Sequence, residues 1–296
     1  MKFSPQDEKS FFPHPRHLEV GMYSGYVPYR KAYERQKELH DAVLSGADDQ
    51  LMLLEHSPVY TVGKRRAADD FLVDPAVLEN RGAEVVRTDR GGRSTFHGPG
   101  QIVLYIICNL GNGARKVRQF VWFMEESVIE YLRRNFAIDA RRKREYPGVW
   151  VGDEKIAAVG ISIRERVTMH GLALNICTDL SFFDAIIPCG IRGFRVCSLA
   201  AVLNRSSGVG SDGVGNASGI VGGSSSGDGV GSDGGIVGGS SSGGSESASD
   251  GGSSSGARGQ GSDMVYDMER EKSRFVEVFA ELFGYSEVRM TRYSMS

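Results

Sequence analysis

The residues best suited to do chemistry in this chain gather in one glycine-rich stretch, residues 90–101. Its twelve residues include four glycines, one proline, two arginines and one histidine. A strand-like run, 83–88, precedes the stretch, and an apolar run, 102–108, follows it. Glycine is costly to order, so this density favours a segment whose backbone N–H groups closely approach a ligand. An ordinary glycine-rich connection would explain the glycines but would leave Arg90 and His97 without a function, so we interpret the stretch as a ligand-binding loop.

A second candidate for chemistry is the thiol of Cys189. Pro188 before it and Gly190 after it predict a turn that presents the thiol and leaves a backbone N–H free. A free thiol, with a pKa of about 8.5, reacts as the thiolate and therefore needs a cationic or basic neighbour. The side chains that could serve are Lys64, His97, Lys155 and His170. The sequence does not rank their distances, and a lone cysteine is more often structural than catalytic.

Lys155 stands at the predicted start of a strand, just after a turn at 152–154. It could be an ordinary surface lysine. The apolar residues that follow it, 156–160, form a surface along which a ligand chain could lie, and a lysine above such a surface loses its proton more easily. A neutral amine could deprotonate a thiol, and a charged one could stabilise the thiolate. His170, ahead of Gly171, fits a structural role and a site role equally well.

Composition excludes several classes of protein. The chain has 296 residues, a net charge of −2, 40% hydrophobic residues and 24% charged residues, which are ordinary values for a globular protein. A net charge this small favours neither nucleic acid nor a membrane surface as a partner. The four cysteines include no CxxC pair, so we expect no metal site. No run approaches the roughly 18 apolar residues of a membrane span, and no targeting segment is visible near the N-terminus.

A low-complexity segment interrupts the chain. Residues 206–262 consist mostly of Gly, Ser and Asp. Such a composition cannot bury enough apolar surface to offset the entropy of ordering, so we expect a disordered, flexible insertion without chemistry. An amphipathic helix follows it and must dock back, so residues 17–205 and 263–290 are predicted to form a single catalytic domain. Residues 1–16, which contain three prolines and no periodicity, are predicted to be a loose N-terminal extension.

The periodicity of apolar residues predicts an α/β fold. Spacings of three and four residues predict helices at 29–44, 117–136 and 263–283. Continuous or alternating apolar runs predict strands at 51–54, 59–62, 101–110, 149–151, 156–163 and 169–176. Together these elements predict a mixed sheet flanked by helices.

Several short motifs follow one another in a distinctive order. They are Arg90-Gly91-Gly92 with Thr95, His97-Gly98-Pro99-Gly100-Gln101, Lys155-Ile156-Ala157 with Gly160, His170-Gly171-Leu172-Ala173-Leu174-Asn175, and Pro188-Cys189-Gly190. In order and spacing, from about residue 25 to residue 199, they resemble the lipoyl(octanoyl) transferase family. The resemblance implies the catalytic fold of biotin and lipoate protein ligases. It also implies transfer of an octanoyl chain from acyl carrier protein to a lysine of a lipoyl domain, the first step of protein lipoylation.

The resemblance also implies roles for individual residues. It implies a thioester acyl-enzyme on Cys189 and a lysine, Lys155, that lowers the pKa of this thiol. The implied contacts to the acyl chain and its carbonyl come from Arg90, Gly91, Gly92, Arg93, Ser94, Thr95, Phe96 and His97, from Ala158, Val159 and Gly160, and from Gly171, Leu172 and Ala173. Many members have a serine where this chain has Ala158, which matters little if that contact is through the backbone. No metal or cofactor is implied, because the substrate carries its own phosphopantetheine on acyl carrier protein.

The implied partners are acyl carrier protein and the lipoyl domains of 2-oxoacid dehydrogenases and of the glycine cleavage H protein. We expect a monomer that binds neither nucleic acid nor membrane. The long Gly/Ser insertion suggests a eukaryotic source, for which the resemblance implies a mitochondrial location; otherwise we expect a cytoplasmic one. We further expect an acyl tunnel made by Val159, Ile161, Leu172 and Leu174, and a docking role for the basic run 141–144.

Four other functions are compatible with the motifs. The nearest is an ATP-dependent lipoate or biotin ligase of related fold, which would not need Cys189. A second is an octanoyl amidotransferase that moves the chain between carrier proteins through the same thiol. A Cys–His thioester hydrolase is a third, and a non-catalytic binder of lipoyl domains is a fourth.

Overall fold

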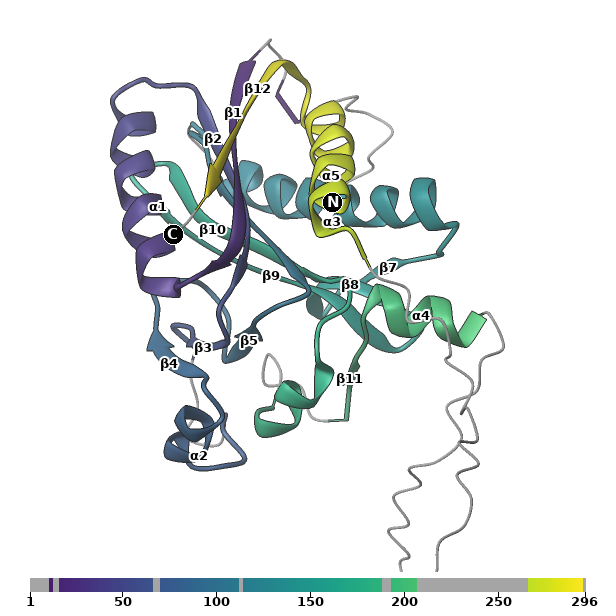
Figure 1. Ribbon diagram of the computed structural model, residues 1–296. Coiled ribbons are helices and arrows are strands. Elements are labelled where there is room, and N and C mark those ends of the chain that lie inside the picture. Colours follow the sequence, from purple (N-terminus) through teal and green to yellow (C-terminus); the bar gives the residue numbers. More distant parts are fainter. Residues whose placement is uncertain are drawn as a thin grey trace, which may run out of the picture. The chain divides into compact units, whose positions relative to one another are not determined.

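The computed structural model describes residues 11–12, 16–65, 70–111, 114–187, 193–206 and 266–294. Within these ranges nine strands form one mixed sheet (Figure 1). In spatial order they are β12 (Tyr285–Ser294), β1 (Arg16–Val27), β2 (Asp49–His56), β6 (Gln101–Ile107), β10 (Val167–Asn175), β9 (Glu154–Arg164), β8 (Tyr146–Val151) and β7 (Arg141–Lys143), with β11 (Arg195–Val196) paired to β9. β1 is parallel to both of its neighbours, whereas the strands from β2 to β7 pair antiparallel.

Helices cover both faces of this sheet (Figure 1). α1 (Tyr29–Leu44) packs on one face, and α3 (Ala114–Phe136) and α5 (Met268–Phe283) pack on the other. Side chains alternate along each strand, so β2 directs Met52 and Leu54 toward α1 and directs Leu51 and Leu53 toward α3 and α5. The short helix α4 (Leu199–Ser206) follows β11. None of the helices in the described ranges has both the length and the apolar character needed to cross a membrane.

A second sheet, of three strands, carries the end of the glycine-rich stretch. It contains β4 (Glu84–Arg87), β3 (Val59–Val62) and β5 (Thr95–His97), in that order. The short helix α2 (Pro75–Asn80) leads into β4, and the 3₁₀ helix η2 (Leu180–Ala185) packs Phe183 against Phe96 of β5. Residues 88–94 thus connect two strands of this sheet, and residues 98–100 lead from β5 to β6 of the main sheet.

The expected mixed sheet flanked by helices is confirmed, and the helix predicted at 29–44 matches α1. Residues 1–10, 13–15 and 207–265 lie outside the described ranges, so the loose extension and the insertion stay predictions there. Two features differ from expectation. Phe11 and Phe12 are buried against Phe283, because aromatic surface is favoured in the core. Ser206, predicted to open the insertion, ends α4.

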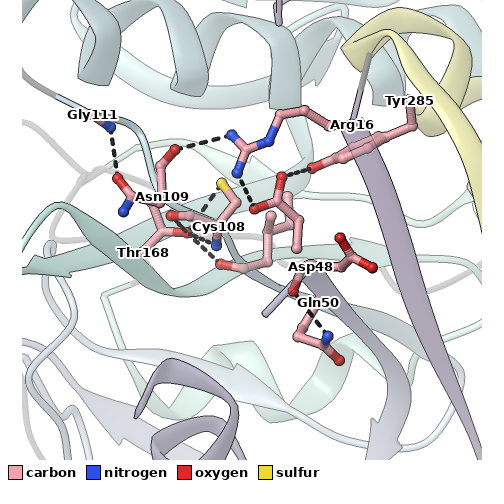
Figure 2. Close-up of polar contacts among 10 residues, drawn as sticks. Arg16, Asp48, Gln50, Cys108, Asn109, Gly111, Thr168 and Tyr285 are labelled. Atoms are coloured by element: carbon pink, nitrogen blue, oxygen red, sulfur yellow. Dashed lines mark hydrogen bonds and ion pairs between the residues drawn. The ribbon is translucent and has the colours of Figure 1, made fainter. Parts of the chain in front are cut away.

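One buried carboxylate joins strands that are distant in sequence. Asp49 at the start of β2 accepts hydrogen bonds from Arg16 of β1 (2.6 Å) and from the Tyr285 hydroxyl of β12 (3.1 Å). Figure 2 labels the two donors, Arg16 and Tyr285, and marks these hydrogen bonds with dashed lines. Arg16 also donates to the carbonyl of Asn109 after β6 (3.0 Å). Asp49 thus fastens the strand that follows the insertion to the centre of the sheet. Burial raises the pKa of Asp49 to about 6, although the charge of Arg16 opposes the shift.

This shift predicts a pH dependence of stability. The folded-state pKa lies above the unfolded value of about 4, so the stabilisation is complete below about pH 4 and is lost as the pH rises through 6. Relative to the non-titrating Asp49→Asn variant, the wild-type protein should lose on the order of 3 kcal/mol of unfolding free energy between about pH 4 and pH 7. Urea unfolding of both proteins at matched pH values measures this difference. A difference that does not change with pH would contradict the prediction.

Candidate active site

A cavity of about 430 Å³ lies between the glycine-rich stretch and the strands β9 and β10. Fifteen of the residues predicted for the site fall in the described ranges, and twelve of them line this cavity. These twelve are Arg90, Gly91, Gly92, Arg93, Thr95, His97, Lys155, Ala158, Val159, Gly160, Gly171 and Leu172. Residues from three distant segments of the sequence therefore meet at one concave surface.

Strand pairing brings two of these segments together. β9 and β10 are antiparallel, with Gly160 opposite Gly171 and Val159 opposite Leu172. The glycine-rich stretch crosses close above them, because the Gly91 N–H donates to the Ile161 carbonyl (2.9 Å). A Cβ on Gly160 would lie 3.1 Å from the Gly91 carbonyl oxygen. The glycines therefore permit a close approach of main chains that forms one wall of the cavity.

Lys155 supplies an amine to the cavity wall. It is the second residue of β9 and is only 6% exposed. Its Nζ donates to the Pro147 carbonyl (3.0 Å) and lies 4.9 Å from the centre of the Trp150 ring. Burial raises the pKa of the nearby Glu125 carboxyl, and the Lys155 charge is one of the groups that lower it. The amine is therefore fixed above an aromatic face rather than free in solvent.

Both arginines of the glycine-rich stretch are held by the protein itself. Arg90 donates to the carbonyl and the hydroxyl of Thr61, at 2.6 Å and 2.7 Å. Arg93 forms an ion pair with the buried Asp70 at 2.5 Å. These contacts anchor the glycine-rich stretch to Thr61 in β3 and to Asp70. Asp70 directly precedes Phe71, which forms an isolated β-bridge. A direct contact of Arg90 with the substrate carbonyl stays a prediction.

His97 is held as a neutral ring with a defined tautomer. The Gln101 amide nitrogen donates to the carbonyl of Phe96 (3.3 Å) and to the side-chain oxygen of Asn175 (2.9 Å). The amide oxygen of Gln101 therefore accepts from the His97 Nδ1–H at 2.7 Å. Burial, with smaller contributions from His56 and Arg90, lowers the pKa of His97 well below its usual value. The unprotonated nitrogen is then Nε2, an acceptor.

His170 connects the glycine-rich stretch to α1 and the sheet. Its Nε2 lies 2.7 Å from Asp89, and this contact lowers the pKa of the Asp89 carboxyl. Its backbone adopts the left-handed conformation (φ 60°), and its N–H donates to the side chain of Gln36 in α1 (2.8 Å). A left-handed histidine is uncommon and strained. His170 thus has a structural role and also lines the cavity.

Three predicted residues lie away from the main cavity. Ser94 is buried and donates to Asp70 (3.0 Å). Phe96 stacks on Phe182, with ring centres 4.5 Å apart. Ala173 lines a small adjoining cavity of about 20 Å³, which Lys155 also lines. Leu174, expected in the acyl tunnel, does not line the main cavity: it points to the same face of the sheet as Leu172 but lies two residues further along β10, where it packs in the core.

Cys189 lies outside the described ranges, which break off at Ile187 and resume at Gly193. The segment that begins at Gly193 runs beside Lys155. Val196 of β11 pairs with Lys155, and the Cys197 N–H donates to the Lys155 carbonyl (3.0 Å). Cys189 precedes Val196 by seven positions.

Sequence reasoning missed three aromatic residues that line the cavity, Tyr29, Tyr105 and Tyr146. Tyr105 carries the only hydroxyl in the apolar run of β6, a signal that could have identified it. Its hydroxyl donates to His56 Nε2 (2.6 Å), and His56 Nδ1 donates to the Val27 carbonyl (2.7 Å). Burial lowers the pKa of His56 to about 4, so this ring is neutral.

The basic run 141–144, for which a docking role is predicted, is partly paired with acidic side chains of the protein itself. Arg142 is paired with Glu125 and Glu126 of α3, and Lys143 is paired with Asp153 (2.8 Å). Much of its positive charge is therefore neutralised, which weakens it as a dock for an acidic protein. Among the described residues, no group of three His, Cys, Asp or Glu side chains is arranged to hold a metal ion.

Comparison with known proteins adds independent information. Residues 28–211 match the family model of the lipoyl protein ligase A/B catalytic domain. The chain is 46% identical over 176 residues to an octanoyltransferase of Thermoanaerobacter sp., which covers 59% of this chain and 77% of the relative. It is 44% identical over 191 residues to an octanoyltransferase of Rubrobacter xylanophilus (64% and 85% covered) and 40% identical over 196 residues to a chloroplastic octanoyltransferase of Arabidopsis thaliana (64% and 69% covered).

Solved structures with the same fold are lipoate protein ligases. Lipoate-protein ligase A bound with ATP superposes with a TM-score of 0.59 at 13% identity, covering 95% of this chain and 89% of that one. A bipartite lipoate protein ligase of Thermoplasma acidophilum superposes with a TM-score of 0.54 at 14% identity, covering 96% and 88%. These likenesses confirm the expected ligase-like catalytic fold.

The cavity wall predicts unequal costs for two glycine substitutions. In Gly171→Ala the new Cβ would lie 1.9 Å from the Leu104 carbonyl oxygen, so β10 and β6 must separate. We expect a loss of more than about 3 kcal/mol of stability. Gly91→Ala is the matched control, because its Cβ would lie 3.3 Å from the Ile161 carbonyl oxygen and should cost about 1 kcal/mol or less. Thermal unfolding of both variants measures the costs, and equal losses would contradict this description of the wall.

Proposed function

Because the chain belongs to the lipoyl protein ligase A/B catalytic domain family and is an acyltransferase related to octanoyltransferases, we propose that it transfers octanoyl groups from acyl carrier protein to lipoyl domains. The transfer proceeds through a thioester on Cys189, activated by Lys155. The acceptor is a specific lysine of the lipoyl domain. This is the first step of protein lipoylation.

The observation that best supports this proposal is the charge distribution in the cavity. Arg90 and Arg93 are engaged by Thr61 and Asp70, and His97 is neutral. The amine of Lys155 lies beside a part of the lining that carries small and apolar side chains, among them Val159 and Leu172. Such a lining suits an uncharged acyl chain whose reacting end lies at the amine.

In the first half of the reaction one proton passes from Cys189 to Lys155 and then to the leaving thiolate, so no cofactor is needed. Lys155 accepts the Cys189 proton, and the thiolate attacks the thioester carbonyl of octanoyl-phosphopantetheine. Backbone N–H groups of the glycine-rich stretch or of Gly190 stabilise the oxyanion. The bond between the carbonyl carbon and the carrier sulfur then breaks, and the carrier thiolate takes the proton from Lys155.

In the second half of the reaction Cys189, the nucleophile of the first half, becomes the leaving group. The neutral amine of the acceptor lysine attacks the acyl-enzyme and passes a proton to Lys155. The bond between carbonyl carbon and Cys189 sulfur breaks, and Lys155 returns the proton to the thiolate. Because a thioester becomes an amide, the transfer runs downhill and needs no ATP. The implied lipoyl-domain acceptors, the monomeric state and the mitochondrial location stay predictions.

The proposal predicts a covalent intermediate. Incubation with octanoyl-acyl carrier protein, followed by intact mass measurement, should show a gain of one octanoyl group on the wild-type protein and none on Cys189→Ala. Lys155→Gln should form the adduct at least about a hundredfold more slowly, since general acid–base catalysis contributes that much or more.

The chain offers a matched control for the lysine. Lys143 lies 4.5 Å from the centre of the same Trp150 ring but does not line the cavity, so Lys143→Gln should form the adduct at the wild-type rate. Transfer by Cys189→Ser from free octanoate and ATP would instead favour a ligase. A wild-type protein that acylates lipoyl domains without any adduct on Cys189 would overturn the thioester step.

A further inference from the structure

Five aromatic side chains close into a ring beside the cavity. Neighbouring ring centres are 6.3 Å apart for Tyr29–Tyr33, 5.7 Å for Tyr33–His170, 6.2 Å for His170–Tyr105, 5.8 Å for Tyr105–His56 and 5.4 Å for His56–Tyr29. We name this cluster the aromatic ring. It joins α1, β2, β6 and β10, so its members come from four elements of the fold.

The aromatic ring is fixed in place. Tyr29, Tyr105 and His170 line the cavity, and all three are at most 4% exposed. Tyr105 is held by its hydrogen bond to His56, and His170 by its contact with Asp89. Stacked and edge-on aromatic contacts add to this rigidity. A wall built in this way cannot yield to a longer ligand without breaking several contacts.

The aromatic ring and Lys155 lie at opposite ends of the lined surface. Tyr105 pairs with Gly171, which pairs with Gly160, so these three residues form one row across the sheet. Lys155 precedes Gly160 by five positions on the same strand, roughly 16 Å at the usual rise of a strand. Ala158 and Val159 line the interval with small and apolar side chains.

We propose that the aromatic ring is the end wall of the acyl site and sets the longest chain that the protein accepts. This inference rests on the proposed function, since it takes the thioester to lie at Lys155. A chain that reaches the wall gains apolar burial with each methylene. One that is longer must displace packed rings, so reactivity should fall abruptly rather than gradually beyond that length.

The test compares octanoyl-, decanoyl-, dodecanoyl- and tetradecanoyl-CoA as donors, with the rate of acyl-enzyme formation followed by intact mass. For the wild-type protein we expect a loss of at least tenfold between octanoyl and dodecanoyl. Tyr29→Ala removes one cavity-lining ring and should reduce this loss to less than threefold. Tyr29→Phe is the matched control, because it keeps the ring and removes only the hydroxyl, so the wild-type cut-off should remain.

Other variants keep the proposal testable. Tyr293→Ala removes an aromatic side chain that stacks on Tyr23 and does not line the cavity, so its cut-off should match that of the wild-type protein. If Tyr29→Ala does not fold, Tyr105→Leu replaces it and should likewise accept dodecanoyl. A gradual decline in the wild-type protein, or an unchanged cut-off in a folded Tyr29→Ala or Tyr105→Leu protein, would overturn the end wall. Absence of any octanoyl adduct on the wild-type protein would instead overturn the proposed function.

Discussion

The site depends on a close approach of three main-chain segments, made possible by glycines. The glycine-rich stretch hydrogen-bonds to β9 through Gly91 and Ile161, and β9 pairs with β10 at Gly160 and Gly171. At Gly171 a Cβ would come within 1.9 Å of the Leu104 carbonyl oxygen, so β6 also takes part in this packing. A side chain at Gly171 would therefore separate β10 from β6 and open the cavity to water. A water-excluding channel is what an acyl chain requires, because its binding comes from the burial of apolar surface.

The cavity is lined by several ionisable groups, yet few of their charges act on a ligand. Arg93 is matched by Asp70, His170 by Asp89, and His97 is kept neutral by burial. These partners belong to the glycine-rich stretch or to strands beside it, so the same contacts that remove charge also hold the stretch in place. The partners of Lys155 are the Pro147 carbonyl and the Trp150 ring, and Thr61 likewise holds Arg90 through neutral groups. The Lys155 amine can accept a proton and return it within one reaction cycle.

The chain that follows the low-complexity segment completes the fold. β12 adds a parallel strand to β1, and α5 packs beside α3. Lys272 of α5 donates to the Tyr23 carbonyl (3.1 Å) and lies 3.5 Å from Glu55, whose other oxygen accepts from the Gly100 N–H (2.8 Å). A buried ion pair with further hydrogen bonds strongly disfavours loss of either partner. The C-terminal helix is therefore connected through Glu55 to the turn that ends the glycine-rich stretch.

The sequence by itself determined the local elements and the identity of the site. Apolar periodicity predicted α1 and most central strands, because burial of one face imposes a repeat that any sequence must carry. The motifs around Arg90, Lys155 and Gly171 predicted the family and most of the cavity lining. Only the tertiary structure decided what each polar side chain contacts: Arg90 donates to Thr61, Ser94 donates to Asp70, and Tyr29 packs against His56. These contacts join residues remote in sequence, and no local pattern encodes them, because register and layer packing arise only when the sheet forms.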